Sequence, residues 1–214
     1  MSAIQPASTI NLFGLNIYAL SKEELLQELQ RHLRSNNKQL LKIFTPNPEQ
    51  VIQSQEDRRF FTELQQADYL LPDGLYLVRA SQLFHLLDRR PRALSQRITG
   101  VEVIEALLQW TAREKMPVLV VGGRNYRSKL PANVSWTPAY AHKEQILPKE
   151  EQQVEALIKK LRPKIVFVAF GAPAQERWIL RHQALLEKNG VKLAMVAGGA
   201  FDFLWGQVKR APQI

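Results

Sequence analysis

Leu70-Leu71-Pro72-Asp73-Gly74 is the stretch from which the fold can be worked out. The apolar run Tyr69–Leu71 predicts a buried strand, which Pro72-Asp73-Gly74 ends in a turn. A helical pattern begins at Leu75 and continues to about Leu87. Ligands of open parallel sheets bind where strands leave the sheet, so we expect Asp73 to be the chemical centre. The glycine beside it would let another molecule approach the backbone closely.

The same alternation of strand and helix extends through the rest of the chain. Capping boxes at Ser21–Glu24 and Thr99–Glu102 predict two helix starts, and Pro173 is well placed at the first position of a third helix. Helices are also predicted at about 49–66 and 150–161, but only short strands between Asn125 and Lys149. Further strands are predicted at Leu40–Phe44, Val118–Val121, Ile165–Phe170 and Val191–Val196, with a small N-terminal β-hairpin at Thr9–Tyr18. This order predicts an α/β fold: a mostly parallel, Rossmann-like sheet with helices on both faces, in one domain over residues 1–214.

Composition narrows the class of protein only weakly. The 214 residues include no cysteine, which suits a reducing compartment, and 45% are hydrophobic, as in an ordinary globular core. The start lacks the blocks of a signal peptide, and apolar runs stay far below the roughly 18 residues of a membrane span. We therefore expect a protein that is soluble or sits on a surface. The net charge of +9 favours nucleic acid, an anionic membrane face or phosphorylated substrates as partners, although solubility alone could explain it.

Polar residues and glycines gather where the predicted strands end. Parallel strands place these exits on one edge of the sheet, where glycine N–H groups and helix N-termini suit phosphate oxygens. The alternative is that these glycines simply end strands. No G-x-G-x-x-G or G-x-x-x-x-G-K-[ST] motif is present, which disfavours a hydride-transfer enzyme or an NTPase. The exits carry Thr45 and Asn47, Asp73, Gly122-Gly123, Gly171, and Gly198-Gly199.

Taken together, the motifs resemble one family, the WecG/TagA/CpsF family of bacterial glycosyltransferases, from about Ile10 to Pro212. The most specific motifs are Gly171–Glu176 and Gly198–Asp202, and Lys209-Arg210-Ala211-Pro212 fits the family's usual continuation. The motifs are Thr45-Pro-Asn47-Pro-Glu49, Leu71-Pro-Asp73-Gly74, Arg97-Ile-Thr-Gly100, Gly122-Gly123, Gly171-Ala-Pro-Ala-Gln175-Glu176 and Gly198-Gly-Ala-Phe-Asp202.

The resemblance implies transfer of an N-acetylmannosamine-type or related sugar, with inversion. The donor would be a UDP-sugar, the acceptor a polyprenyl-diphosphate-linked sugar, and the pathway cell-surface polysaccharide synthesis. Asp73 would be the general base, although an Asp in this turn also serves as a local cap. Thr45 is counted with Asp73 as catalytic. Thr45 and Asn47 would contact sugar hydroxyls, or else form hydrogen bonds within their own turn. Arg97 would lie near the diphosphate or else belong to the solvated basic loop Arg89–Arg97.

The remaining candidates bind substrate in the same interpretation. Gln175 and Glu176 would contact the donor, although Glu176 also suits the first turn of a helix electrostatically. Phe201 has a core alternative and Asp202 a structural one. The candidate substrate-binding residues are Asn47, Arg97, Gly122, Gly123, Gly171, Pro173, Gln175, Glu176, Gly198, Gly199, Phe201 and Asp202.

No metal or other cofactor is expected. The sequence has no Asp-x-Asp, and His32, His85, His142 and His182 are scattered. Cations and backbone amides would then stabilise the leaving UDP. The partners would be the UDP-sugar, the lipid-linked acceptor and the cytoplasmic face of the membrane, with a possible homo-oligomer and no nucleic acid. We expect a cytoplasmic, peripheral location at the inner membrane face.

Two departures from the family pattern affect these expectations. Residues between Gly123 and Lys149 are fewer than the family leads us to expect, which leaves the donor sugar open. The chain stops at Ile214, where the family usually continues into a basic amphipathic tail that reaches the membrane. A truncated or shortened member would bind nucleotide-sugar and turn over poorly. The alternatives are therefore a catalytically weak nucleotide-sugar-binding protein and, less favoured, a basic nucleic-acid-binding domain.

Overall fold

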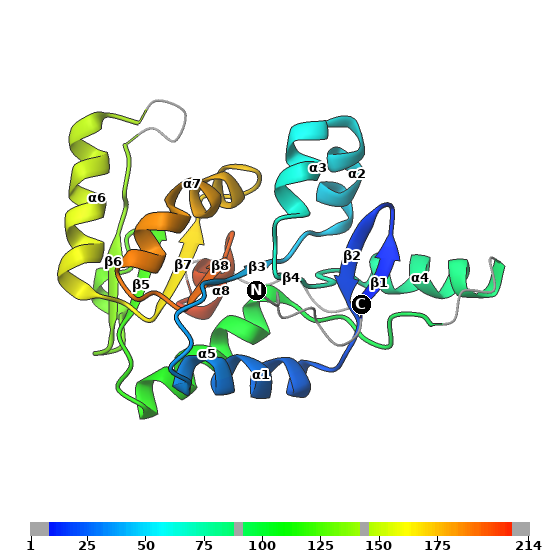
Figure 1. Ribbon diagram of the computed structural model, residues 1–214, viewed down its shortest axis with the longest axis horizontal. Helices are drawn as coiled ribbons and strands as arrows, with labels where there is room; N and C mark the ends of the chain where they lie inside the picture. The colour runs from blue at the N-terminus through cyan, green and yellow to red at the C-terminus, as the bar shows by residue number, and fades with distance from the viewer. Residues whose placement is uncertain (1–8, 88–91, 142–145, 207–214) are drawn as a thin grey trace.

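An eight-stranded sheet runs through the middle of the molecule (Figure 1). The computed structural model describes residues 9–87, 92–141 and 146–206. Within them the strand order is β1-β2-β4-β3-β8-β7-β5-β6, and only the β1–β2 pair is antiparallel. The strands are β1 (Thr9–Leu12), β2 (Leu15–Tyr18), β3 (Leu41–Phe44), β4 (Tyr69–Leu70), β5 (Val118–Gly122), β6 (Val134–Thr137), β7 (Ile165–Ala169) and β8 (Leu193–Val196).

Helices cover both faces of this sheet. One face is packed by α2 (Pro48–Glu56), α3 (Arg58–Leu64), α6 (Pro148–Leu161) and α7 (Ala174–Lys188). The other is packed by α1 (Lys22–Arg34), α5 (Gly100–Arg113) and α8 (Ala200–Leu204). Helix α4 (Leu75–Leu87) extends beyond the hairpin edge of the sheet, and the short 3-10 turn η1 (Arg127–Lys129) follows β5 (Figure 1).

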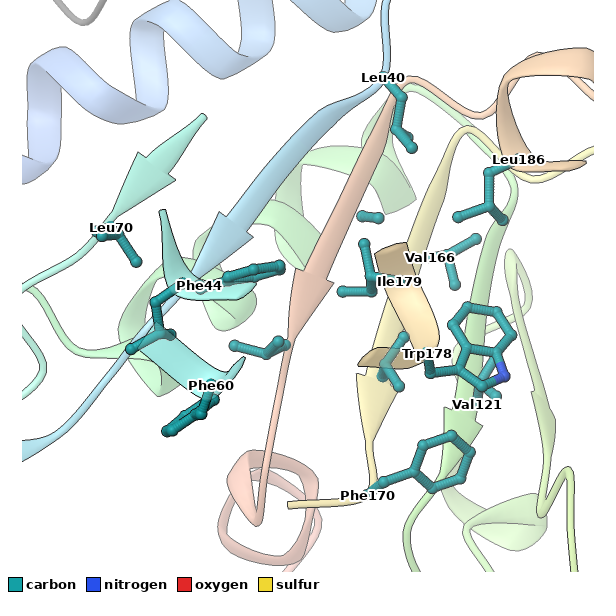
Figure 2. Close-up of a cluster of buried hydrophobic side chains, with 14 of the residues drawn as sticks. Leu40, Phe44, Phe60, Leu70, Val121, Val166, Phe170, Trp178, Ile179 and Leu186 are labelled. Carbon is teal, nitrogen blue, oxygen red and sulfur yellow. The ribbon is translucent and has the colours of Figure 1, made fainter. Parts of the chain in front are cut away.

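Each central strand contributes to both layers of the core because side chains alternate along a strand. In β7, Ile165 and Phe167 face the layer of α1 and α5, whereas Val166 and Val168 face the layer of α6 and α7. Figure 2 shows the second layer, in which Trp178 of α7 lies near β-strand residues. Strands buried on both faces read as the continuous apolar runs from which the parallel sheet was predicted.

The predicted α/β fold, mostly parallel sheet and N-terminal hairpin are confirmed, and the differences are local. The helical segments predicted over 49–66 are the two helices α2 and α3, which meet at Asp57: this residue ends α2, and its carboxylate caps α3 by accepting from Phe60 N. Pro173 is the residue before helix α7 and follows a cis peptide bond, so it does not occupy the first helical position. Between Asn125 and Lys149 the described residues include one strand, β6, together with the 3-10 turn η1 and the first residues of α6. The single domain over 1–214 stays a prediction.

Candidate functional site

The strand order brings the predicted strand exits to one edge of the sheet. The five strands involved are consecutive neighbours, β4-β3-β8-β7-β5, and every pair among them is parallel. Their carboxyl ends therefore share one edge, which is where open α/β sheets bind ligands. We call this edge, from the Asp73 turn after β4 to Gly122-Gly123 at the end of β5, the rim.

Asp73 is held in place by the loop that leads into α5. The N–H of Gly100 donates to Asp73 Oδ2 at 3.1 Å, and the N–H of Ile98 donates to the Pro72 carbonyl at 3.2 Å. A Cβ on Gly100 would lie 3.2 Å from Thr45 Oγ1 and 3.6 Å from Asp73 Oδ2. Thr45 and Asp73 thus lie against the same glycine, and both side chains are half-buried. Three segments far apart in the sequence meet around one carboxylate.

Asn47 and Gly74 have local roles at this end of the rim. Asn47 caps α2: its Oδ1 accepts from Gln50 N at 2.8 Å, and its own N–H donates to Gln50 Oε1 at 3.1 Å. The Asn47 Oδ1 is therefore used in a local hydrogen bond, as the alternative interpretation expected. A Cβ on Gly74 would lie only 2.6 Å from Pro48 Cδ. The close approach expected of a ligand at Gly74 is made instead by Pro48, which docks α2 on the Asp73 turn.

Arg97 lies half-buried beside the start of α5. Burial raises the pKa of the Glu102 carboxyl, but hydrogen bonds from Thr99 and the charges of Lys22 and Arg97 outweigh it and leave that pKa below its usual value. Arg97 is therefore within electrostatic reach of the first turn of α5, next to the loop that holds Asp73. Residues 88–91 of the basic loop lie outside the described residues.

The rim glycines fall into two groups. A Cβ on Gly171 or Gly198 would meet nothing within 4 Å, and their φ values are +79° and +49°. A Cβ on Gly122 would lie 2.5 Å from the Phe170 ring, and one on Gly123 would lie 2.5 Å from the Tyr126 hydroxyl. The space beside Gly171 and Gly198 is therefore open, but the Gly198 N–H already donates to Gln175 Oε1. Gly122 is buried beside Phe170, whereas Gly123 is exposed, with Tyr126 only on the side where a Cβ would lie. Gly199 is exposed and faces Asp202, whose Oδ2 would lie 3.9 Å from a Cβ there.

The buried side chain and backbone of Gln175 connect the loops that follow β7 and β8. Gln175 is buried, its N–H donates to the Gly171 carbonyl at 3.1 Å, and its Oε1 accepts from Gly198 N at 3.0 Å. Its Nε2 donates to Glu176 Oε1 at 3.2 Å. These contacts give Gln175 a clear role in fixing the loops after β7 and β8.

Glu176 is a buried carboxyl next to this link. Its side chain is 1% exposed, and its Oε2 has no hydrogen-bond partner among the described residues. Burial raises the pKa of Glu176 to about 7, against the weaker lowering effect of its hydrogen bonds. Glu176 therefore takes up a proton near neutral pH.

Asp202 and Phe201 support the β5 end of the rim. The Tyr126 hydroxyl donates to Asp202 Oδ1 at 2.8 Å, and Arg124 Nε lies 3.5 Å from Asp202 Oδ2. Phe201 is fully buried and packs on Tyr126 and Phe167, so its core alternative is the one that the placement fits. Burial raises the pKa of Tyr126 to about 12, so this phenol stays a donor.

Arg124 is a rim residue that the sequence reasoning missed. Its side chain is largely exposed while Asp202 holds its guanidinium from below. The available signal was its position directly after Gly122-Gly123, at a strand exit. An exposed, oriented guanidinium there can contact phosphate oxygens.

A cavity of about 850 Å³ opens between α3 and α7 and meets the rim at Gly171–Ala174. Asp73 and Thr45 do not line it. Its cations are engaged with carboxylates: Arg59 and Arg177 both lie 2.9 Å from Glu63. This cavity therefore adjoins the rim at the start of α7 and lies apart from the Asp73 turn.

Metal ligands and membrane spans were both sought within the described ranges. No cluster of three or more His, Cys, Asp or Glu that could hold a metal ion occurs in residues 9–87, 92–141 and 146–206. Over the same ranges, no helix combines the length and the apolarity that crossing a bilayer requires. His142 and the segment 209–212 lie outside the described residues.

Comparison with known proteins gives a consistent match. A family model described as "Glycosyl transferase WecG/TagA/CpsF family" matches residues 10–214. Curated relatives from Staphylococcus aureus strains NCTC 8325 / PS 47, COL and MRSA252 are each 26% identical over 214 aligned residues, which is 96% of this chain and 79% of the relative. All three are named N-acetylglucosaminyldiphosphoundecaprenol N-acetyl-beta-D-mannosaminyltransferase.

Proposed function

Because the chain belongs to the WecG/TagA/CpsF family of glycosyl transferases, we propose that it transfers a sugar of the N-acetylmannosamine type. The donor is a UDP-sugar, the acceptor is a polyprenyl-diphosphate-linked sugar, and the transfer inverts the anomeric centre. The names of its relatives state an acceptor of this kind, an N-acetylglucosaminyl-diphosphoundecaprenol. The observation that carries the proposal is the meeting of Thr45, Asp73 and Gly100 at the shared edge of the parallel strands.

Asp73 acts as the general base in this proposal. The acceptor hydroxyl attacks the anomeric carbon from the face opposite the diphosphate, and the new C–O bond forms as the bond to UDP breaks. The hydroxyl proton passes to the Asp73 carboxylate, and UDP leaves with the bonding electron pair. The Gly100 N–H fixes one carboxylate oxygen, which supports an orientation suited to proton transfer. Thr45, against the same glycine, orients the acceptor or donor sugar.

The leaving UDP is stabilised by backbone and guanidinium groups along the rim. Gly171 leaves backbone open directly before α7, a helix of 15 residues whose N-terminus favours anionic groups. Arg97 and Arg124 supply guanidinium groups at the two ends of the rim. Gln175 connects the loops after β7 and β8. The same loops are supported by Pro173, Glu176, Gly199 and Asp202. Donors that are fixed before the reaction stabilise developing charge without reorganisation.

The proposed reaction implies which partners the protein binds and where in the cell it works. The excess of positive charge serves the diphosphates of both substrates and an anionic membrane face, with no nucleic acid required. A lipid-linked acceptor places the enzyme at the cytoplasmic membrane face, as a peripheral protein of cell-surface polysaccharide synthesis. Whether it forms a homo-oligomer stays a prediction.

A transfer assay tests the proposal. UDP-N-acetylmannosamine is incubated with the protein and a synthetic polyprenyl-diphosphate-GlcNAc, and both UDP release and the disaccharide-lipid product are measured. We expect UDP release that depends on the acceptor and a product heavier by one N-acetylhexosamine. Binding of the UDP-sugar without any transfer would instead support the weak nucleotide-sugar-binding alternative.

A further inference from the structure

Helix α4 exposes large apolar side chains on the side that faces away from the core. Its inner side is already buried through Leu77, Val78 and Ser81. The outer side carries Tyr76 at 70% exposure, Leu83 at 52%, Leu86 at 75% and Leu87 at 69%. A helix that is apolar on both sides is normally covered on both sides. Contiguous exposed apolar residues of this kind mark interaction surfaces.

The outer residues form one stripe with positive charge and no acidic group. Tyr76, Arg79, Leu83 and Leu86 recur at spacings of three and four, which places them on one helix face. The Arg79 guanidinium lies 5.9 Å from the centre of the Tyr76 ring on this face. No Asp or Glu occurs between Leu75 and Leu87. We call Tyr76, Arg79, Leu83, Leu86 and Leu87 the α4 surface.

The turn of the N-terminal hairpin continues the same apolar region. Phe13, 43% exposed, packs edge-on against Phe84 of α4 with their ring centres 5.5 Å apart. Figure 1 shows α4 projecting past the β1–β2 hairpin, at the opposite end of the sheet from α6. The α4 surface is therefore presented at one extremity of the molecule, with an aromatic contact bracing the helix from the hairpin side.

We propose that the α4 surface docks on the face of an anionic phospholipid bilayer. Thirteen residues are too few to span a bilayer, but an apolar face with one arginine and no carboxylate suits a helix lying in the interface. A second copy of this chain is a poorer occupant, because both copies carry net charge +9 and would bring like-charged Arg79 side chains together. Anionic headgroups have the complementary charge.

The position of α4 relative to the site gives this docking a use, and this step alone rests on the proposed function. Leu75 begins the helix two residues after Asp73. A bilayer held against α4 would therefore bring the rim close to the headgroup layer. The diphosphate and sugars of a polyprenyl-linked acceptor lie in that layer, so docking would raise the concentration of acceptor near Asp73.

The test is co-sedimentation with vesicles of phosphatidylcholine, with and without phosphatidylglycerol. The variant Leu83→Gln/Leu86→Gln removes apolar groups from the α4 surface without changing charge. The matched control is Leu147→Gln, at the residue directly before α6, where the leucine is also 52% exposed. We expect the unaltered protein and the control to bind phosphatidylglycerol vesicles equally. The double variant should bind at least about tenfold more weakly, because two leucines lose their burial in lipid.

Three outcomes would overturn the proposal. They are failure of the unaltered protein to bind phosphatidylglycerol vesicles, equal binding by the double variant, and loss of self-association in sedimentation velocity with vesicle binding unchanged. Thermal unfolding of the double variant should match that of the unaltered protein, because both leucines are exposed. Transfer to a short-chain, water-soluble acceptor separates docking from catalysis. Vesicle binding that depends on Leu83 and Leu86 without any transfer would support docking and count against the proposed function.

Discussion

Glu176 combines deep burial with a carboxyl oxygen that has no hydrogen-bond partner among the described residues. Burial raises its pKa from 4.5 to about 7 in the folded state. At pH values between 4.5 and about 7, the Glu176 carboxyl is protonated in the folded protein and ionised in the unfolded chain. Stability should therefore be fully retained below about pH 4.5 and fall as pH rises through 7, by up to about 3 kcal/mol in all.

The prediction for Glu176→Gln is that this pH dependence disappears. Urea unfolding midpoints of the unaltered protein should fall between mildly acidic and mildly alkaline pH, whereas those of the variant should change less. Glu187→Gln, an exposed residue of the same helix, is the control and should keep the original dependence. The same slope in the protein and in Glu176→Gln would show that Glu176 titrates normally.

The two groups of rim glycines predict opposite effects of alanine. Gly122→Ala drives a Cβ to 2.5 Å from the Phe170 ring at φ +86°, so it should cost about 2 kcal/mol of stability or more. Gly198→Ala meets open space and should cost about 1 kcal/mol through its backbone alone. UDP binding should nevertheless weaken in Gly198→Ala. Thermal unfolding and titration calorimetry measure both, and the reverse order of stabilities would contradict the assignment.

The sequence predicted which residues gather at the rim better than it predicted what each does there. Asp73 and Thr45 follow neighbouring parallel strands, so their convergence could be inferred from topology alone. The contact of Pro48 with Gly74 could not, nor could that of Phe170 with Gly122. Both depend on side chains that only the folded packing brings close.

Among the elements, the connection between α7 and the loop after β8 is the most informative. Gln175 accepts from Gly198 N and is held by the Gly171 carbonyl. Gln175→Leu keeps the volume but leaves the Gly198 N–H without that acceptor. We expect a loss of about 1–2 kcal/mol in stability and weaker donor binding.

The measurement for this variant compares the KM for the UDP-sugar with kcat. A positioning role predicts a raised KM with a smaller change in kcat, because the phosphate-facing backbone is no longer fixed. Gln183→Leu, on a more accessible face of the same helix, is the control. Unchanged donor KM in Gln175→Leu would show that the link does not hold the rim.

Element boundaries show where sequence patterns are insufficient. The apolar pattern predicted helical segments over 49–66 but not the point at which they divide, which is Asp57, because this residue both ends α2 and caps α3. Strand β4 has only two residues because Pro72 lacks an N–H and the turn begins at once. Periodicity reports which face is buried, whereas such breaks depend on single capping contacts.

On the scale of the whole molecule, the α/β class, the sheet and the family were all predictable. The resemblance over Ile10 to Pro212 is confirmed by a family match to residues 10–214. The cavity between α3 and α7 was not predictable, because the ion pair of Glu63 and Arg177 joins segments 114 residues apart. Long-range charge pairing leaves no local pattern in a sequence.

Metal removal is a test at the same scale. The sequence has no Asp-x-Asp, and we assign stabilisation of the leaving UDP to Arg97, Arg124 and backbone N–H groups. EDTA should therefore leave the transfer rate unchanged. A loss of rate that Mg²⁺ or Mn²⁺ restores would show that a metal performs this role.

The central claim is that a carboxylate on the shared strand edge removes the acceptor proton, and Asp73→Asn tests it most directly. Asparagine has the same shape and its Oδ1 can still accept from Gly100 N, so the rim should stay intact. The account predicts that acceptor-dependent UDP release falls at least about 100-fold. The Kd for the UDP-sugar, measured by calorimetry, should be unchanged. Full turnover in Asp73→Asn would contradict the account.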